Sequence, residues 1–202
     1  MIPNITRRIV QSLLIVTGTF IFYQCACGRI NSQSEIPDKV LNKANKYIIA
    51  NVGKDYFDKY IKPDFQDTKK IHSLYEMVYN FKIPDKPYVN TKITFIVDST
   101  GQVINKESVI GLPDCLSYPE KCQFNIDEAQ ARSIAQKNNF PKGIKEWIVE
   151  FKWEPKYDQY VWSVLSTLRE TSGSFGTRGN GQIMLIDPNT GNIISQNPWY
   201  VR

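Results

Sequence analysis

The chain has 202 residues, of which 22% are charged and 12% are aromatic, and its formal net charge is +5. This composition is typical of a globular protein and excludes an intrinsically disordered one. Acidic residues lie among the basic ones throughout, and no basic cluster has interleaved aromatic residues. The sequence therefore argues against a nucleic-acid partner.

Residues 1–28 predict an export signal. Arg7 and Arg8 precede an apolar run that continues to Tyr23, and small residues and cysteines follow it. A basic start, an apolar middle and a small-residue end are the three parts of a signal peptide. The rest of the chain is therefore expected to fold outside the cytoplasm, and it is long enough for one large domain or two small ones.

The end of this segment resembles a bacterial lipoprotein signal. In that family a cysteine after a small residue becomes the lipidated N-terminus, as Ala26-Cys27 would allow, although Gln24 stands where the family has an aliphatic residue. The resemblance implies lipid on Cys27, a polar tether at 29–35 and membrane anchoring in the periplasm or at the cell surface. Plain cleavage after Gly28 and retention as an uncleaved anchor are the alternatives.

Residues 36–112 predict a first helix-plus-sheet unit. Apolar residues recur at helical spacing from Val40 to Ile48, between Pro37 and Gly53. A shorter helical pattern and a polar loop follow, at 56–61 and 62–72. Strands are then expected at 75–83, 93–97 and 102–110, with turns at 84–87 and at 98–101, where Gly101 allows a positive φ.

The loop at 113–123 contains Cys115 and Cys122. In an oxidising compartment such a pair predicts a disulfide. The bond would contribute about 2–3 kcal/mol and is expected to lie between the units, outside either core. A zinc site is disfavoured because His72 is the only histidine and no second close cysteine pair is present. No metal ligand and no cofactor are assigned.

Residues 124–202 predict a second helix-plus-sheet unit. Asn125 and Glu128 have the spacing of a helix capping box. The residues expected on the buried face of that helix are Ile126, Ala129, Ile134 and Ala135. Strands are expected at 147–153, 160–168 and 183–187, the last forming a hairpin with 192–195.

The two units echo each other in sequence. Residues 76–82 parallel 146–152, and 96–104 parallel 186–194. The echoes predict an α+β fold built from two imperfectly repeated units, in each of which a helix packs on an antiparallel sheet. A chance likeness between two hairpins is the alternative.

Residues 124–195 resemble a PepSY-type domain. The resemblance rests on the helix at 126–135, the tryptophan-bearing strand at 146–151, the Tyr-Val-Trp-Ser-Val strand at 160–164 and the hairpin at 186–194. It implies a small, non-catalytic, extracytoplasmic module of the kind often proposed to bind or inhibit peptidases. The implied partner is an unidentified protein or peptide of the cell envelope.

A second stretch, 92–136, is similar to the C-terminal domain of TonB-type energy transducers. The similarity lies in Ile-Thr-Phe-Ile-Val-Asp-Ser-Thr-Gly-Gln-Val-Ile followed by a helix. It would imply an interaction domain. The proline-rich spacer and the Pro-x-Trp-x-Pro stretch of that family have no counterpart here.

A glycine-rich stretch at 171–181 interrupts the PepSY-like pattern. A phosphate-binding loop would open a helix and carry a lysine, whereas this stretch leads into a strand. It predicts a mobile hairpin loop, with Arg178 and Phe175 as candidate partner contacts.

No catalytic residue is assigned. A catalytic triad would have to use His72, which is expected on the surface. Glu146, Glu150 and Glu154 share the polar face of one strand. A solvated face is the favoured interpretation, and an envelope polymer-processing enzyme or its accessory subunit is the alternative.

Four aromatic residues allow two interpretations. Their alternation along strands predicts a hydrophobic core, and a carbohydrate-stacking platform is the alternative. The four are Trp147, Trp153, Trp162 and Tyr160.

Overall fold

The structure is a computed structural model that describes residues 36–173 and 176–201. Cys27, the predicted leader and tether, and Phe175 lie outside the described residues. The described residues belong to one compact unit within Ser32–Arg202. The fold is α+β, as the sequence predicts, with two separate antiparallel sheets.

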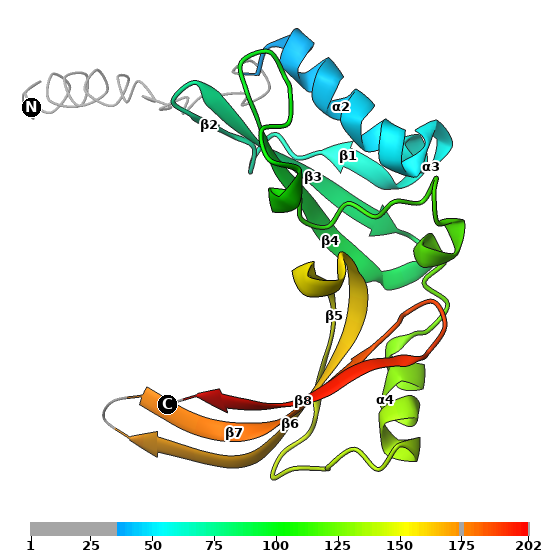
Figure 1. The fold of residues 1–202 in the computed structure, drawn as a ribbon, viewed down its shortest axis with the longest axis vertical. Helices are drawn as coiled ribbons and strands as arrows, with labels where there is room; N and C mark the ends of the chain where they lie inside the picture. The colour runs from blue at the N-terminus through cyan, green and yellow to red at the C-terminus, as the bar shows by residue number, and fades with distance from the viewer. Residues whose placement is uncertain (1–35, 174–175, 202) are drawn as a thin grey trace, which may run out of the picture. The chain divides into compact units, whose positions relative to one another are not determined.

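The first sheet is built from the N-terminal half of the described chain (Figure 1). β4 pairs with one edge of β3, and the short strands β1 and β2 follow each other along the other edge. The elements of this half are α2 (Asp38–Val52), α3 (Lys54–Tyr60), β1 (Ile61–Pro63), β2 (Lys69–Ile71), β3 (Leu74–Ile83) and β4 (Lys86–Val97).

The periodicity of α2 explains how it packs. Val40, Ala44, Ile48 and Val52 recur every fourth residue and are all buried in the first hydrophobic cluster. Gly53 ends the helix with a φ of 86°, a conformation that costs glycine little. In β3 the predicted alternation holds, because Tyr75, Met77, Tyr79, Phe81 and Ile83 are buried in that same cluster.

Two expectations for this half are wrong. The polar stretch 62–72 is not all loop, since it contains part of β1 and all of β2, whose exposed residues suit the solvated edge of a sheet. The strand expected at 102–110 is absent. The chain touches β4 only through two isolated bridges, and between them Asn105 starts a 3₁₀ turn by accepting a hydrogen bond from the amide of Glu107.

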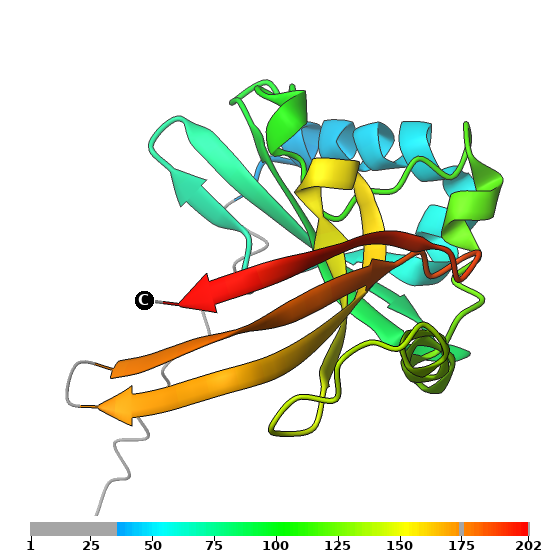
Figure 2. The same ribbon diagram turned by 60° about the horizontal axis from the view of Figure 1, so that its bottom comes forward.

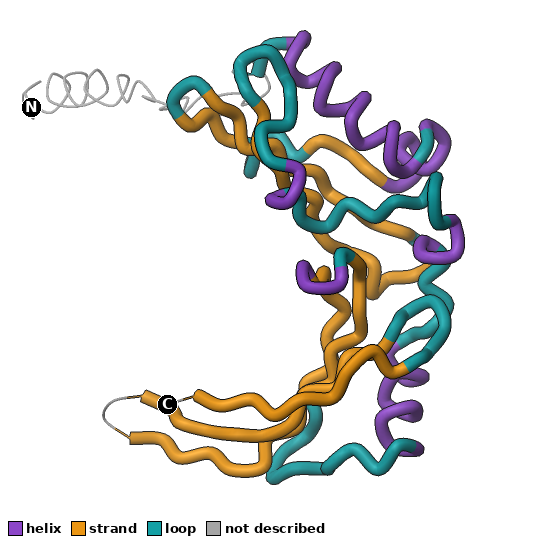
Figure 3. Tube along the Cα trace, viewed as in Figure 1, coloured by secondary structure: helices purple, strands orange, loops and turns teal. Residues whose placement is uncertain are grey.

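The second sheet has the strand order β5-β6-β7-β8 and carries α4 (Figure 2). Its elements are α4 (Glu128–Lys137), β5 (Ile148–Glu154), β6 (Gln159–Gly173), β7 (Gly176–Ile186) and β8 (Ile193–Val201). Two short 3₁₀ turns, Pro119–Cys122 and Pro155–Tyr157, lie before α4 and between β5 and β6 (Figure 3).

The helix α4 begins two residues later than predicted. Asp127, not Asn125, is the N-cap, and its capping-box partner is Gln130, not Glu128. Both reciprocal bonds form, from the amide of Gln130 to Asp127 at 2.8 Å and from the amide of Asp127 to the side chain of Gln130 at 2.9 Å.

The buried face of α4 also differs from the prediction. Ala131 and Ala135 are fully buried, whereas Ala129 is exposed. Residues two positions apart on a helix point about 200° apart, so burial of Ala131 turns Ala129 toward solvent. Ile126 and Ile134 are half-buried and pack against the second cluster, as expected.

One of the two sequence echoes has a structural counterpart. Asp98 accepts hydrogen bonds from the amides of Thr100 and Gln102, and Asp187 accepts one from the amide of Asn189. Each turn ends in a glycine with positive φ that lies against the helix of its own half. Gly101 abuts α2, and Gly191 abuts the side chains of Ile126 and Ile134.

The other echo pairs strands that are not equivalent. Residues 76–82 lie in β3, which is flanked by strands on both edges, whereas most of 146–152 lies in β5, an edge strand. The strand that leads into the second turn is β7, and its partner is β6. By topology, therefore, β3 corresponds to β6 and β4 to β7.

The Asp98 turn makes a prediction about pH. The amide of Gln102 and the hydroxyl and amide of Thr100 bond to the Asp98 carboxylate and lower its pKa. A lowered pKa stabilises the fold above the unfolded-state value, and that stability is lost as the pH falls through the folded value. Thermal melts of wild type and Asp98→Asn should therefore differ at pH 7 and converge below about pH 4. Melting curves that stay parallel throughout would contradict this role.

Two hydrophobic clusters accompany the two sheets. The first cluster is not confined to the first half of the chain, because it contains Phe124 and Tyr160. The tyrosine hydroxyl donates a 2.8 Å hydrogen bond to the carbonyl of Gly111. Trp153, expected in the second core, packs against the first cluster, and Phe151 packs against both. The predicted domain limits, 36–112 and 124–202, remain predictions.

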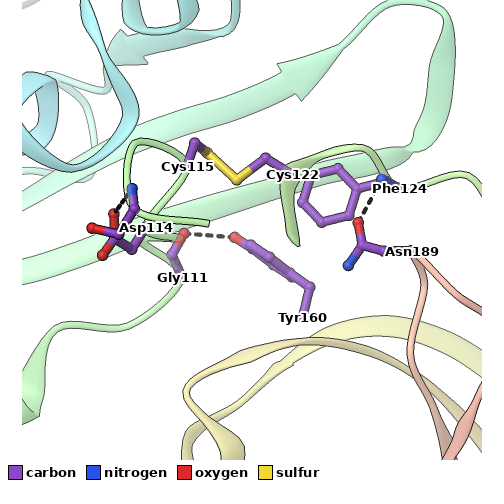
Figure 4. Close-up of a disulfide and its surroundings, with 8 residues drawn as sticks. Gly111, Asp114, Cys115, Cys122, Phe124, Tyr160 and Asn189 are labelled. Atoms are coloured by element: carbon purple, nitrogen blue, oxygen red, sulfur yellow. Dashed lines mark hydrogen bonds between the residues drawn. A yellow bond between two sulfur atoms is a disulfide. The ribbon is translucent and has the colours of Figure 1, made fainter. Parts of the chain in front are cut away.

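The predicted disulfide joins Cys115 and Cys122 (Figure 4). Its position differs from the expectation, because both cysteines are buried members of the first cluster. Asp114 holds the loop by accepting a hydrogen bond from the amide of Ser117 at 2.9 Å, a bond that lowers the pKa of the aspartate. The disulfide is therefore part of a hydrophobic core and does not lie free between two units.

Removing the disulfide should destabilise the whole protein. We expect Cys115→Ala with Cys122→Ala to lower the free energy of unfolding by about 2–3 kcal/mol, because the short loop then opens freely in the unfolded chain. Urea unfolding measures this, and wild type in reductant should behave like the double variant. Full labelling of both thiols in the native, unreduced protein would contradict the bond.

Candidate binding surface

The part of the second sheet that lies beyond β5 is largely exposed. β5 pairs with β6 only as far as Leu165, whereas β6, β7 and β8 continue together (Figure 2). We call residues 168–173, 176–180 and 199–201 the distal sheet. The expectation of a loop at 171–181 is wrong for the described residues, because 171–173 and 176–181 are paired strand ends, with Thr171 opposite Arg178.

Glycines explain why these strands can pair so closely. Trp199 of β8 lies over Gly179 and Gly181 of β7, and its indole N–H donates a 3.0 Å hydrogen bond to the carbonyl of Ser166. A Cβ at Gly181 would lie 1.8 Å from that same carbonyl oxygen. The glycines therefore serve sheet packing.

The opposite face of the distal sheet carries both arginines. Cross-strand partners share a face, so Arg169 lies with Asn180 and Tyr200, and Thr171 lies with Arg178. These five side chains line one cavity of about 260 Å³. Of these five residues the sequence points only to Arg178, because its alternation predicts that β6 ends at 168 and the final hairpin at 195. The alternation of Arg169 and Thr171 is the strand signal that could have revealed them.

A larger groove, of about 660 Å³, lies beside the segment between α4 and β5. Its lining includes Phe140, Trp147, Lys142, Lys145 and one carboxylate, that of Glu146. The described residues bring no second carboxylate into this groove.

The other members of the predicted acidic face lie on β5. Glu150 is exposed, and Glu154 is within 3.8 Å of Lys152, so the solvated interpretation describes this face. His72 is exposed in the turn between β2 and β3, with a φ of 57°. Within 36–173 and 176–201, no three histidine, cysteine or acidic side chains gather as metal ligands would.

The aromatic residues belong to the core, as predicted. Tyr160 and Trp162 are buried, and Trp147 and Trp153 are half-buried against the clusters. Burial raises the pKa of Tyr160. The indole N–H of Trp162 donates to the carbonyl of Ile126 at 2.7 Å and joins the sheet to the segment before α4. Tyr160 and Trp162 therefore offer no exposed ring face.

None of the helices in the described parts of the chain combines the length and apolar composition needed to span a membrane. No curated protein and no solved structure matches the chain. Residues 125–197, which comprise α4 and nearly all of the second sheet, match the family model PepSY, described as peptidase propeptide and YPEB domain. The resemblance of 124–195 to a PepSY-type domain is therefore confirmed by a family match over residues 125–197.

Proposed function

We propose that this protein is a membrane-tethered, extracytoplasmic, non-catalytic binding module that binds or inhibits a peptidase or another protein of the cell envelope. The observation that carries the proposal is the match of 125–197 to a family described as peptidase propeptide. Modules of this family are typically non-catalytic and work outside the cytoplasm. The disulfide supports the same compartment, because such bonds persist where the environment is oxidising.

The distal sheet is the proposed contact surface. Its strands are exposed on both faces beyond β5, and Arg178, together with Phe175, was selected from the sequence as a partner contact. Main-chain groups along the free edge of β8 could add to binding by pairing with an extended segment of the partner. Pro198 limits that pairing at one position, since it has no N–H.

The proposal is tested with the full-length protein in its native envelope and with a soluble form, residues 29–202, that lacks Cys27. Cross-linking in the native envelope followed by mass spectrometry identifies partners, and each captured peptidase is then assayed with a fluorogenic peptide. We expect saturable, stoichiometric inhibition, and binding of the protein to an active-site variant of that peptidase. Absence of binding to any envelope protein, together with hydrolysis of an envelope polymer by the protein alone, would support the enzyme alternative.

The tether makes a separate prediction. Cys27→Ser should move the protein from the membrane fraction to the soluble envelope fraction, because the lipid would have no attachment site. Cys25→Ser is the matched control and should stay membrane-bound. Retention of the first variant and release of the second would show that Cys27 is not the lipidated residue.

A further inference from the structure

Two arginines occupy one face of the distal sheet. Arg169 lies opposite Asn180, and Arg178 lies opposite Thr171, so the arginines are diagonal neighbours on β6 and β7. Diagonal positions in an antiparallel pair are about 7–8 Å apart, within reach of side chains as long as arginine. Both guanidinium groups can therefore face the same small volume.

Their charges are not compensated by the residues around them. Neither Arg169 nor Arg178 forms an ion pair with a residue that the structure describes. The nearest acidic residue in sequence, Glu170, pairs with Gly179 across the strands, so it points to the opposite face, where it contacts Lys145. Two like charges on neighbouring strand positions repel each other, and an anion between them removes that repulsion.

The surroundings of the arginines suit a carboxylate. Thr171 and Asn180 add neutral hydrogen-bonding groups to the cavity, and Tyr200, which is 67% exposed, forms its rim. Arginine binds carboxylates through two parallel N–H bonds, and exposed tyrosine beside arginine is typical of protein interfaces. At about 260 Å³ the cavity suits side chains better than a drug-sized ligand.

We infer that this face binds two carboxylates of an extended acidic segment of the partner protein. Residues two apart in an extended segment lie about 7 Å apart, which matches the diagonal spacing of Arg169 and Arg178. The expected motif is therefore an acidic residue, any residue and a second acidic residue. This inference rests on the proposed function, because it takes the partner to be a protein.

A membrane surface is the less favoured occupant. Each basic residue near an anionic bilayer contributes only about 1 kcal/mol, so two arginines alone bind weakly. The groove with more basic residues lies elsewhere, where Lys43, Lys46 and Lys106 surround Tyr47. Planar guanidinium groups beside Thr171 and Asn180 fit a directional ligand better than a diffuse negative surface.

The test uses two acetylated, amidated hexapeptides of equal charge, Ser-Glu-Ser-Glu-Ser-Ser and Ser-Ser-Glu-Glu-Ser-Ser. Binding to the soluble form, residues 29–202, is followed by NMR at the arginine Nε–Hε groups and at the amides of β6 and β7. We expect the first peptide to bind more tightly and to shift both arginine signals. Arg169→Gln with Arg178→Gln should weaken binding by at least about tenfold. Lys39→Gln with Lys46→Gln, at two exposed lysines of α2, should not.

The opposite results are as clear. Equal weakening by the arginine and lysine variants would show general charge attraction and overturn the inference. Arginine-dependent binding to vesicles containing anionic lipid, with no binding of either peptide, would also overturn the inference. If the arginine variant binds no peptide and still inhibits the peptidase fully, the inference fails and the proposed function stands. Arginine-dependent peptide binding without inhibition of any peptidase would support the carboxylate site and contradict the proposed function.

Discussion

Replacing Phe124 with alanine is expected to lower the free energy of unfolding by about 3–5 kcal/mol. Phe124 is fully buried, and its ring packs against Phe81 of β3, Phe151 of β5 and Tyr160 of β6. Removing the ring opens a cavity shared by the two sheets. The loss should therefore appear as one cooperative unfolding transition, shifted as a whole.

Backbone contacts hold Phe124 in place independently of its ring. Its amide donates to Asn189 at 2.8 Å (Figure 4). Its carbonyl accepts hydrogen bonds from Tyr88 and Lys86. Alanine at this position keeps these bonds, so the change measures ring burial, apart from the cost of the residue's φ of 46°. Tyr118→Ala, at a half-exposed ring in the disulfide loop, is the control and should cost less than about 1 kcal/mol.

The same measurement tests the predicted domain limits. Urea unfolding followed by circular dichroism and by tryptophan fluorescence reports on both sheets. Two separate transitions, of which Phe124→Ala shifts one, would support two independent units at 36–112 and 124–202. A single shifted transition would support one cooperative unit, and a fragment ending at Ile110 should then be unable to fold alone.

Replacing Gly181 with alanine is expected to cost roughly 3 kcal/mol or more. The added methyl group would lie 1.8 Å from the carbonyl oxygen of Ser166 and 2.6 Å from the indole nitrogen of Trp199. Both atoms belong to neighbouring strands, so β6 and β8 would have to separate from β7. The bond from Trp199 to Ser166 would break as the strands move.

Gly173 provides a control in the same pair of strands. No atom lies within 4 Å of the position that its Cβ would take, so Gly173→Ala should change the unfolding free energy by less than about 0.5 kcal/mol. Urea midpoints measure both variants. Equal costs for the two substitutions would show that the glycines matter only through chain entropy and not through strand contact.

The elements that local periodicity specifies were predictable from the sequence. α2, β3 and the two aspartate-to-glycine turns follow from apolar spacing and from side-chain bonds within a few residues. The absence of a strand at 102–110 was not predictable. This segment has the alternation of a strand, yet it pairs with β4 only at two isolated bridges. The N-cap is Asp127 and not the predicted Asn125. Either residue type can cap a helix, and the choice between them goes with the burial of Ala131.

The candidate site could not be predicted from the local sequence, because it depends on how the strands pair. Arg178 was visible as a charge in a glycine-rich stretch, but Arg169 becomes its neighbour only through the register of β6 against β7. That register includes an irregularity between Thr167 and Arg169. The role of Gly181 likewise depends on Trp199, which comes from the following strand. Pairing across strands, and not composition, decides what these residues do.

The hydrogen bond between Tyr160 and Gly111 has a consequence for the order of folding, because it joins residues 49 positions apart. When a chain leaves the ribosome or a translocation pore from its N-terminus, β3 and β4 emerge well before Tyr160. Until that residue arrives, Phe81 lacks one of its ring partners and the apolar face of the first sheet is incomplete. Completion of the first hydrophobic cluster therefore waits for the second half, and the emerging chain is open to aggregation during that interval.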